Sequence, residues 1–177
     1  MHSTTPCNNN NAKDQPQGSK PRVWRSNVAI QADRQHVLET LTAIDACHAW
    51  TPVEFEVDAP RITRLLAGTR VAVSGGLAGR RLRFCVEVFA AEADRLLLHA
   101  TGPVDLTADY ELHDVADGSH VDAAISVRHG SGRLAPAFAA VTSGLLAGGA
   151  LNRALRRIAE EAERRQRCDE LALGRAA

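Results

Sequence analysis

The sequence lacks an excess of either charge: its 21 lysine and arginine residues balance its 21 aspartate and glutamate residues. A neutral chain has no long-range field that attracts nucleic acid, so we expect no nucleic-acid partner. Its apolar runs are shorter than the roughly 20 residues that span a bilayer, and residues 1–19 lack the basic and then apolar order of a secretory signal. We therefore expect a cytoplasmic protein without stable membrane insertion.

The sequence also lacks recognisable metal and catalytic motifs. Its cysteines, Cys7, Cys47, Cys85 and Cys168, form no C-x-x-C pair, so their spacing predicts neither a zinc site nor a disulfide framework. The seven histidines form no H-x-x-x-H or H-E-x-x-H pattern, and no G-x-S-x-G or phosphate-binding loop is present. We expect no metal and no cofactor, and no catalytic residue is identified.

The composition predicts one folded domain between two tails. Residues 1–21 contain four consecutive asparagines, three prolines and almost nothing apolar, which predicts a disordered tail. The whole sequence has 177 residues, of which 45% are hydrophobic. This is enough apolar side-chain surface to form one hydrophobic core. We expect the domain to span residues 22–167, followed by a flexible tail over residues 168–177.

The start of the domain predicts a strand and two short helices. Apolar residues alternate from Val23 to Ile30, as on one face of a strand. Asp33 lies where a helix N-cap belongs, and apolar residues follow it at spacings of four and three, which predicts a helix of about three turns. A second short helix is expected over residues 45–50, because Pro52 disfavours a helical residue before it.

About six further strands are predicted between residues 55 and 129, where apolar residues occupy every second position. Glycines at 75–76 are expected to break one pair of strands, and Asp117–Gly118 supplies the positive φ of a tight turn. Because the connections are brief, successive strands must be antiparallel.

After His129 the apolar period changes to 3.6, which predicts a single long helix ending near Arg167 and weakened around Gly148–Gly149. Its outer face predicts ion pairs four residues apart, Arg157–Glu161 among them. An antiparallel sheet with one apolar face should curl around this helix. The small residues in the central part of the helix would leave a cavity there: Ala139, Ala140, Gly144, Ala147, Gly148 and Gly149.

This order of elements resembles the START-like helix-grip superfamily (SRPBCC), which includes polyketide cyclase/dehydrase-like proteins. The resemblance rests on the first strand with residues 32–38, the segment His-Ala-Trp-Thr-Pro at 48–52, the hairpin at 108–121 and the helix at 151–163. It implies an α+β fold, in which a curved antiparallel sheet of about seven strands wraps around a long C-terminal helix. It also implies two short helices after the first strand and a deep hydrophobic pocket, but no single reaction.

Eight residues are candidates for lining this pocket. Trp50 is expected at one end of it, either as an aromatic wall or as a packing anchor. Tyr110 falls on the apolar face of its strand, so its buried hydroxyl would need a partner or a ligand. His48 and His129 are the two histidines that the pattern turns inward, where a satisfied structural role is the alternative. The full set is Trp50, Phe84, Tyr110, His129, His48, Phe138, Val141 and Leu145.

The leading hypothesis is a carrier or sensor for a small hydrophobic ligand, such as a lipid, an isoprenoid or a polyketide-like ring. The alternative is a polyketide cyclase or dehydratase, in which a pocket residue such as Tyr110 or His129 acts as acid or base. A third reading is an interaction module with a filled pocket. The sequence leaves open whether the chain forms a homodimer.

Overall fold

The structure is a computed structural model that describes residues 21–51, 55–59, 61–77 and 79–174. The tail predicted over residues 1–21 lies outside the described residues, apart from residue 21. The elements follow the order β1 (Arg22–Ile30), α1 (Arg34–Thr42), α2 (Ile44–Trp50), β2 (Phe55–Val57), β3 (Arg70–Leu77), β4 (Arg80–Glu92), β5 (Arg95–Thr101), β6 (Val104–Val115), β7 (Gly118–His129), α3 (Ala135–Ala147) and α4 (Ala150–Gly174).

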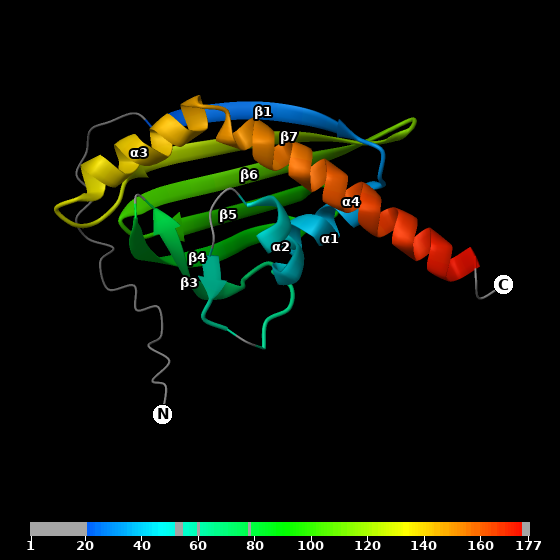
Figure 1. The fold of residues 1–177 in the computed structure, drawn as a ribbon, viewed down its shortest axis with the longest axis horizontal. Coiled ribbons are helices and arrows are strands. Elements are labelled where there is room, and N and C mark those ends of the chain that lie inside the picture. The colour runs from blue at the N-terminus through cyan, green and yellow to red at the C-terminus, as the bar shows by residue number, and fades with distance from the viewer. Residues whose placement is uncertain (1–20, 52–54, 60, 78, 175–177) are drawn as a thin grey trace.

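The seven strands form one antiparallel sheet in the order β1-β7-β6-β5-β4-β3-β2. This confirms the predicted α+β architecture, with two short helices after the first strand. Helices α3 and α4 follow one another across one face of the curved sheet, and the C-terminal turns of α4 extend beyond the sheet edge (Figure 1). None of the described helices combines the length and apolar character needed to cross a bilayer.

Helix α1 and strand β7 begin where the sequence predicts, at the Asp33 cap and at the Gly118 turn. The Asp33 carboxylate accepts a hydrogen bond from the backbone N–H of His36 at 2.9 Å, which caps α1. Gly118 begins β7 with φ +136°, and a Cβ there would lie 2.1 Å from the carbonyl oxygen of Ile30. Only glycine therefore fits this turn, which also lets β7 start close beneath the end of β1.

The predicted break at Gly75–Gly76 is wrong. Both glycines belong to β3, where Gly75 pairs with Leu82 and Gly76 pairs with Arg81 of β4. The pairing of β3 with β4 continues as far as Leu77, which pairs with Arg80. Glycine is tolerated inside this strand because the sheet ladder supplies the backbone hydrogen bonds, and its missing side chain leaves space above the sheet.

The single long helix predicted after His129 is instead two helices. The chain leaves α3 through Gly148, and Gly149 adopts φ +82° before α4 begins. Gly149 thus adopts a left-handed conformation that a residue with a side chain disfavours. Helix α4 continues past the predicted end at Arg167 to Gly174, so residues 168–174 of the expected flexible tail are helical.

The C-terminal half of α4 is fastened to the segment between β1 and α2. Glu163 and Gln166 accept hydrogen bonds from the backbone N–H groups of Gln31 and Asp33, at 3.0 and 2.8 Å. Arg165 donates to Asp45 of α2 at 2.9 Å. Together with the buried stripe of α4, these contacts hold the helix against the sheet. That stripe contains Leu151, Ala154, Leu155, Ile158, Ala159 and Ala162.

Helix α3 is fastened more lightly. Its buried residues are Ala135, Phe138 and Ala139, which lie at its N-terminal end. Phe138 packs with Leu82, Val104 and other residues in a cluster separate from the main core. No residue of α3 after Ala139 is fully buried, although Leu146 packs against both clusters.

Candidate functional site

The main cavity lies between the concave face of the sheet and the junction of α3 with α4, and its volume is about 490 Å³. This size is within the usual range of sites for small organic molecules. Its sheet wall consists of Phe55, Val73, Gly75, Gly76, Phe84, Val86, Ala100, Val104, Leu106, Tyr110 and Ile125. Trp50 and the helix residues Thr142, Leu145, Leu146, Ala150, Leu151, Arg153, Ala154 and Arg157 complete it.

Strand periodicity explains the sheet wall. Phe84 and Val86 of β4, like Val104 and Leu106 of β6, are two residues apart and therefore point to the same face. The residues that pair with Phe84, Val86 and Leu106 across the ladder are small or branched; Val86, for example, pairs with Val71 and Ala100. Short side chains at such positions keep the helices from sealing the space above the sheet.

Trp50 serves in both of the roles considered from the sequence. Its indole Nε1 donates a hydrogen bond to the backbone carbonyl of Thr40 at 3.1 Å, which ties the end of α2 to α1. The ring of Trp50 also lines the main cavity. The packing anchor is thus itself part of the cavity wall.

Tyr110 lines the main cavity and is 5% exposed. Within the described part of the chain, no hydrogen bond is found for its hydroxyl group, yet no buried polar atom is left unsatisfied there, so this oxygen faces the cavity space. Burial raises the pKa of Tyr110, with a smaller contribution from Cys47. The hydroxyl therefore stays protonated at neutral pH and can donate a hydrogen bond to a guest.

Two arginines of α4, Arg153 and Arg157, lie at the exposed rim of the main cavity. The predicted pair Arg157–Glu161 is not formed: Glu161 accepts hydrogen bonds from Arg164 and Arg165, each with a distance of 2.9 Å from Nε. The hydrogen bond from Arg164, followed by that from Arg165, lowers the pKa of Glu161 despite its partial burial. Among the residues that the structure describes, Arg157 has no carboxylate partner.

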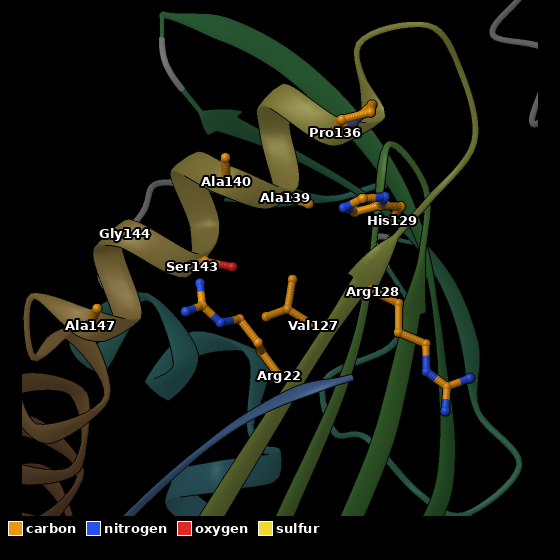
Figure 2. A pocket seen from close by; sticks show the side chains of 10 residues that line it. All are labelled: Arg22, Val127, Arg128, His129, Pro136, Ala139, Ala140, Ser143, Gly144 and Ala147. Carbon is orange, nitrogen blue, oxygen red and sulfur yellow. The ribbon is translucent and has the colours of Figure 1, made fainter. Parts of the chain in front are cut away.

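A second cavity, of about 470 Å³, lies on the other side of α3 and contains His129. Figure 2 shows Arg22 of β1 extending toward the Ser143 side of α3, and His129 directed toward Ala139. The side chain of Arg128 is directed away from the helix in the same view. His129 and Tyr110 therefore line different cavities.

The remaining candidates line neither cavity. His48 is exposed and stacks on Phe55, with ring centroids 4.5 Å apart, because α2 buries Ala46 and Cys47 instead. Phe138 is buried in its own cluster, and Val141 is exposed on α3. Of the eight candidates, the main cavity brings together Trp50, Phe84, Tyr110 and Leu145.

Sequence reasoning placed the small residues of α3 in the main cavity, but the structure places four of them in the second cavity: Ala139, Ala140, Gly144 and Ala147. The helix wall of the main cavity comes instead from Thr142, Leu145 and Leu146 and from the first turns of α4. The bend at Gly148–Gly149 rotates one helix relative to the other, so a single helical stripe could not predict both faces. One sequence signal could have predicted the part of the wall that α4 forms. Ala150 and Ala154, like Arg153 and Arg157, are four residues apart and therefore share a helix face.

The described residues contain no group of three or more His, Cys, Asp or Glu side chains that could hold a metal ion. They also place no carboxylate or histidine in the wall of the main cavity. Cys47 is buried near it, and burial raises the pKa of its thiol to about 12, followed by the effect of Asp45. This thiol is not a nucleophile at neutral pH.

No protein-family model and no curated protein matches the sequence. Solved structures do match. TTHA0849 from Thermus thermophilus has a TM-score of 0.60 at 16% identity, over 80% of this chain and 97% of that one. The hypothetical protein jhp0584 from Helicobacter pylori has a TM-score of 0.60 at 14% identity, over 80% and 88%. Ara h 8.0201 has a TM-score of 0.53 at 9% identity, over 78% and 98%. These likenesses establish a helix-grip fold.

Proposed function

We propose that the protein is a START-like carrier or sensor that encloses a small hydrophobic molecule in the main cavity. The proposed ligand-binding domain spans residues 22–167, and we propose that it works in the cytoplasm. Lipids, isoprenoids and polyketide-like rings are the ligand classes of suitable size and polarity. The observation that carries the proposal is an apolar cavity of about 490 Å³ left open between sheet and helices.

The energetics favour an apolar guest. Burying about 200 Å² of apolar ligand surface contributes roughly 5 kcal/mol before the cost of association is subtracted. The wall offers this surface through aromatic and aliphatic side chains such as Trp50, Phe84 and Leu106. A polar guest would lose its hydration and find few partners there.

The connection of α3 supports ligand entry. This helix buries three residues and is joined to α4 through Gly148 and Gly149. Helix α4, in contrast, is held by Glu163, Arg165 and Gln166. Movement of α3 about the glycine junction would open the main cavity by separating Phe138 and Leu146 from their packing partners, while the contacts that hold α4 stay in place.

Titration with the neutral fluorescent probe N-phenyl-1-naphthylamine tests the proposal directly, together with native mass spectrometry of the purified protein for bound apolar molecules. We expect the probe's fluorescence to rise saturably, with one probe bound per chain. Absence of saturable binding by the probe, combined with absence of any co-purified apolar compound, would overturn the proposal.

A matched pair of variants assigns the binding to one cavity. Ala154→Phe fills the main cavity from α4, whereas Ala147→Phe adds the same side chain to the second cavity. We expect the first to lower probe affinity at least tenfold and the second to leave it unchanged. Gly76→Leu, placed on the opposite wall where an added Cβ meets no atom within 4 Å, keeps the test valid if Ala154→Phe misfolds.

The cyclase or dehydratase alternative receives less support. It requires at least two acid or base groups that converge on one substrate. Tyr110 faces the main cavity as a neutral donor, but His129 lines the second one. Polar groups of the main cavity therefore suit orientation of a guest better than proton abstraction from it.

A further inference from the structure

The polar side chains of the main cavity differ in how deeply they are buried. Tyr110 is buried within it, whereas Arg153 and Arg157 belong to exposed positions at its rim. The described wall contains two guanidinium groups and no carboxylate. The open end of an otherwise apolar cavity is therefore positively charged.

The two arginines act on the same side of α4. They are four residues apart, so their side chains lie one turn apart on one helix face. Arg153 is held in place because its Nη1 donates to the backbone carbonyl of Gly148 at 2.8 Å. Its other guanidinium hydrogens remain available, since that hydrogen bond uses one nitrogen.

No ion pair to Arg153 or Arg157 is found among the residues that the structure describes. Glu161, the nearest predicted partner for Arg157, is occupied by Arg164 and Arg165. Ala150 and Leu151 also line the cavity, so the N-terminal turn of α4 forms part of the wall and adds the positive pole of its helix dipole to it. Unpaired positive charge beside an apolar space favours a guest with a negative group.

We propose that the ligand is an amphipathic anion, with its apolar body in the main cavity and a carboxylate or phosphate group held at the rim by Arg153 and Arg157. The inference rests on the proposed function and narrows its ligand class. A guanidinium group binds either oxyanion with two parallel hydrogen bonds, and such charge-assisted bonds are stronger than neutral ones. Burial of the ligand's apolar body supplies most of the affinity, and the two arginines select anionic over neutral ligands.

The competing explanation is that both arginines lay their aliphatic stems along the apolar rim and keep their charges in water. The two explanations predict different results for two ligands with the same apolar chain. An anion held by the arginines binds more tightly than the matching alcohol. If the stems alone matter, the better hydrated anion binds no more tightly than the alcohol.

The experiment is displacement of N-phenyl-1-naphthylamine by decanoate, by decyl phosphate and by 1-decanol, at neutral pH and low salt. We expect the better of the two anions to bind about tenfold more tightly than 1-decanol. Its identity decides between the carboxylate and the phosphate. Raising the salt to about 0.5 M should reduce this advantage and leave 1-decanol binding unchanged.

Variants complete the test. Arg157→Gln should remove most of the advantage of the anion, and Arg153→Gln combined with it should remove the rest, while 1-decanol binds as before. Arg156→Gln is the matched control, because Arg156 is exposed on α4 next to Arg157 and does not line the cavity. This substitution should change the affinity for neither the anion nor 1-decanol.

The outcomes separate the two levels of the proposal. If neither the probe nor any of the three ligands binds, the proposed function itself fails. If the probe and 1-decanol bind but the anions have no advantage, only the present inference is overturned. Equal losses for anions and alcohol in the arginine variants would also overturn it, because they would indicate a structural role for the side chains.

Discussion

The indole nitrogen of Trp50 donates its hydrogen bond to the carbonyl oxygen of Thr40 at 3.1 Å, while the same ring forms part of the cavity wall. Replacing Trp50 with phenylalanine keeps an aromatic wall but removes the donor. We expect Trp50→Phe to lower the free energy of unfolding by about 1 kcal/mol, the usual contribution of such a bond. Urea denaturation measures this change.

Trp24→Phe is the control, because the described residues offer no hydrogen bond to the Trp24 indole. It should cost less than Trp50→Phe. In the Trp24→Phe background, Trp50 becomes the only tryptophan of the chain, and we expect its emission to shift when the cavity is filled. Equal stability losses in both variants would contradict the anchoring role of Trp50.

The conformation of Gly118 leads us to expect a large loss of stability from a small substitution at this position. Gly118→Ala would force an alanine into φ +136° and place its Cβ 2.1 Å from the carbonyl oxygen of Ile30. We expect a loss of roughly 3 kcal/mol or more in the free energy of unfolding, because strain and steric overlap add.

Gly68→Ala separates the two causes. Gly68 has φ +81°, but an added Cβ there meets nothing within 4 Å. It should therefore lose only about 1 to 2 kcal/mol, the strain of the left-handed conformation. Comparable losses at the two sites, measured by chemical denaturation, would show that the contact with Ile30 relaxes freely.

These local rules also explain how far the sequence predicts the fold. Strand alternation, the Asp33 cap and the turn at Gly118 depend on near neighbours in the chain, and all three match the structure. The continuation of β3 through Gly75 and Gly76 depends on pairing with β4 instead. Local propensity could not reveal that support.

The cavity was harder to predict because it depends on how α3 and α4 are rotated. Tyr110 and Phe84 were predictable from strand parity, which the sheet preserves. Arg157 was assigned to the solvated face because Glu161 lies four residues later. Competition from Arg164 and Arg165 for that carboxylate is visible only in three dimensions.

His36 predicts a pH-dependent contribution to stability. Its Nδ1 lies 2.8 Å from Asp33 and its Nε2 lies 3.3 Å from Asp169. Burial alone would lower the pKa of His36, but the hydrogen bonds and charges of Asp33 and Asp169 outweigh it and raise the pKa above its ordinary value. The charged imidazole therefore links α1 to the C-terminal part of α4.

A raised folded-state pKa gives stability that is complete below the unfolded pKa of about 6.5 and is lost as pH rises through the folded value. We expect His36→Gln to cost up to about 1 kcal/mol at acidic pH near 5.5 and less at pH near 8.5, since both carboxylates are exposed. Denaturation at the two pH values measures the difference. His99→Gln is the control, because no described carboxylate forms an ion pair with His99. A larger cost for His36→Gln at the higher pH would contradict the assignment.

We expect removal of the Tyr110 hydroxyl to leave stability almost unchanged and to weaken the binding of guests that accept a hydrogen bond. Because its hydroxyl has no hydrogen-bond partner among the described residues, Tyr110→Phe should change the free energy of unfolding by no more than about 0.5 kcal/mol. A guest that accepts a hydrogen bond should lose affinity several-fold, since a buried bond contributes about 1 kcal/mol.

Displacement of the fluorescent probe by 2-acetylnaphthalene and by naphthalene separates these effects, because only the first carries an acceptor. Phe84→Leu, on the same wall, should weaken both compounds alike. A clear loss of stability in Tyr110→Phe would instead mean that the hydroxyl is satisfied within the protein, and its role in orienting a guest would then be excluded.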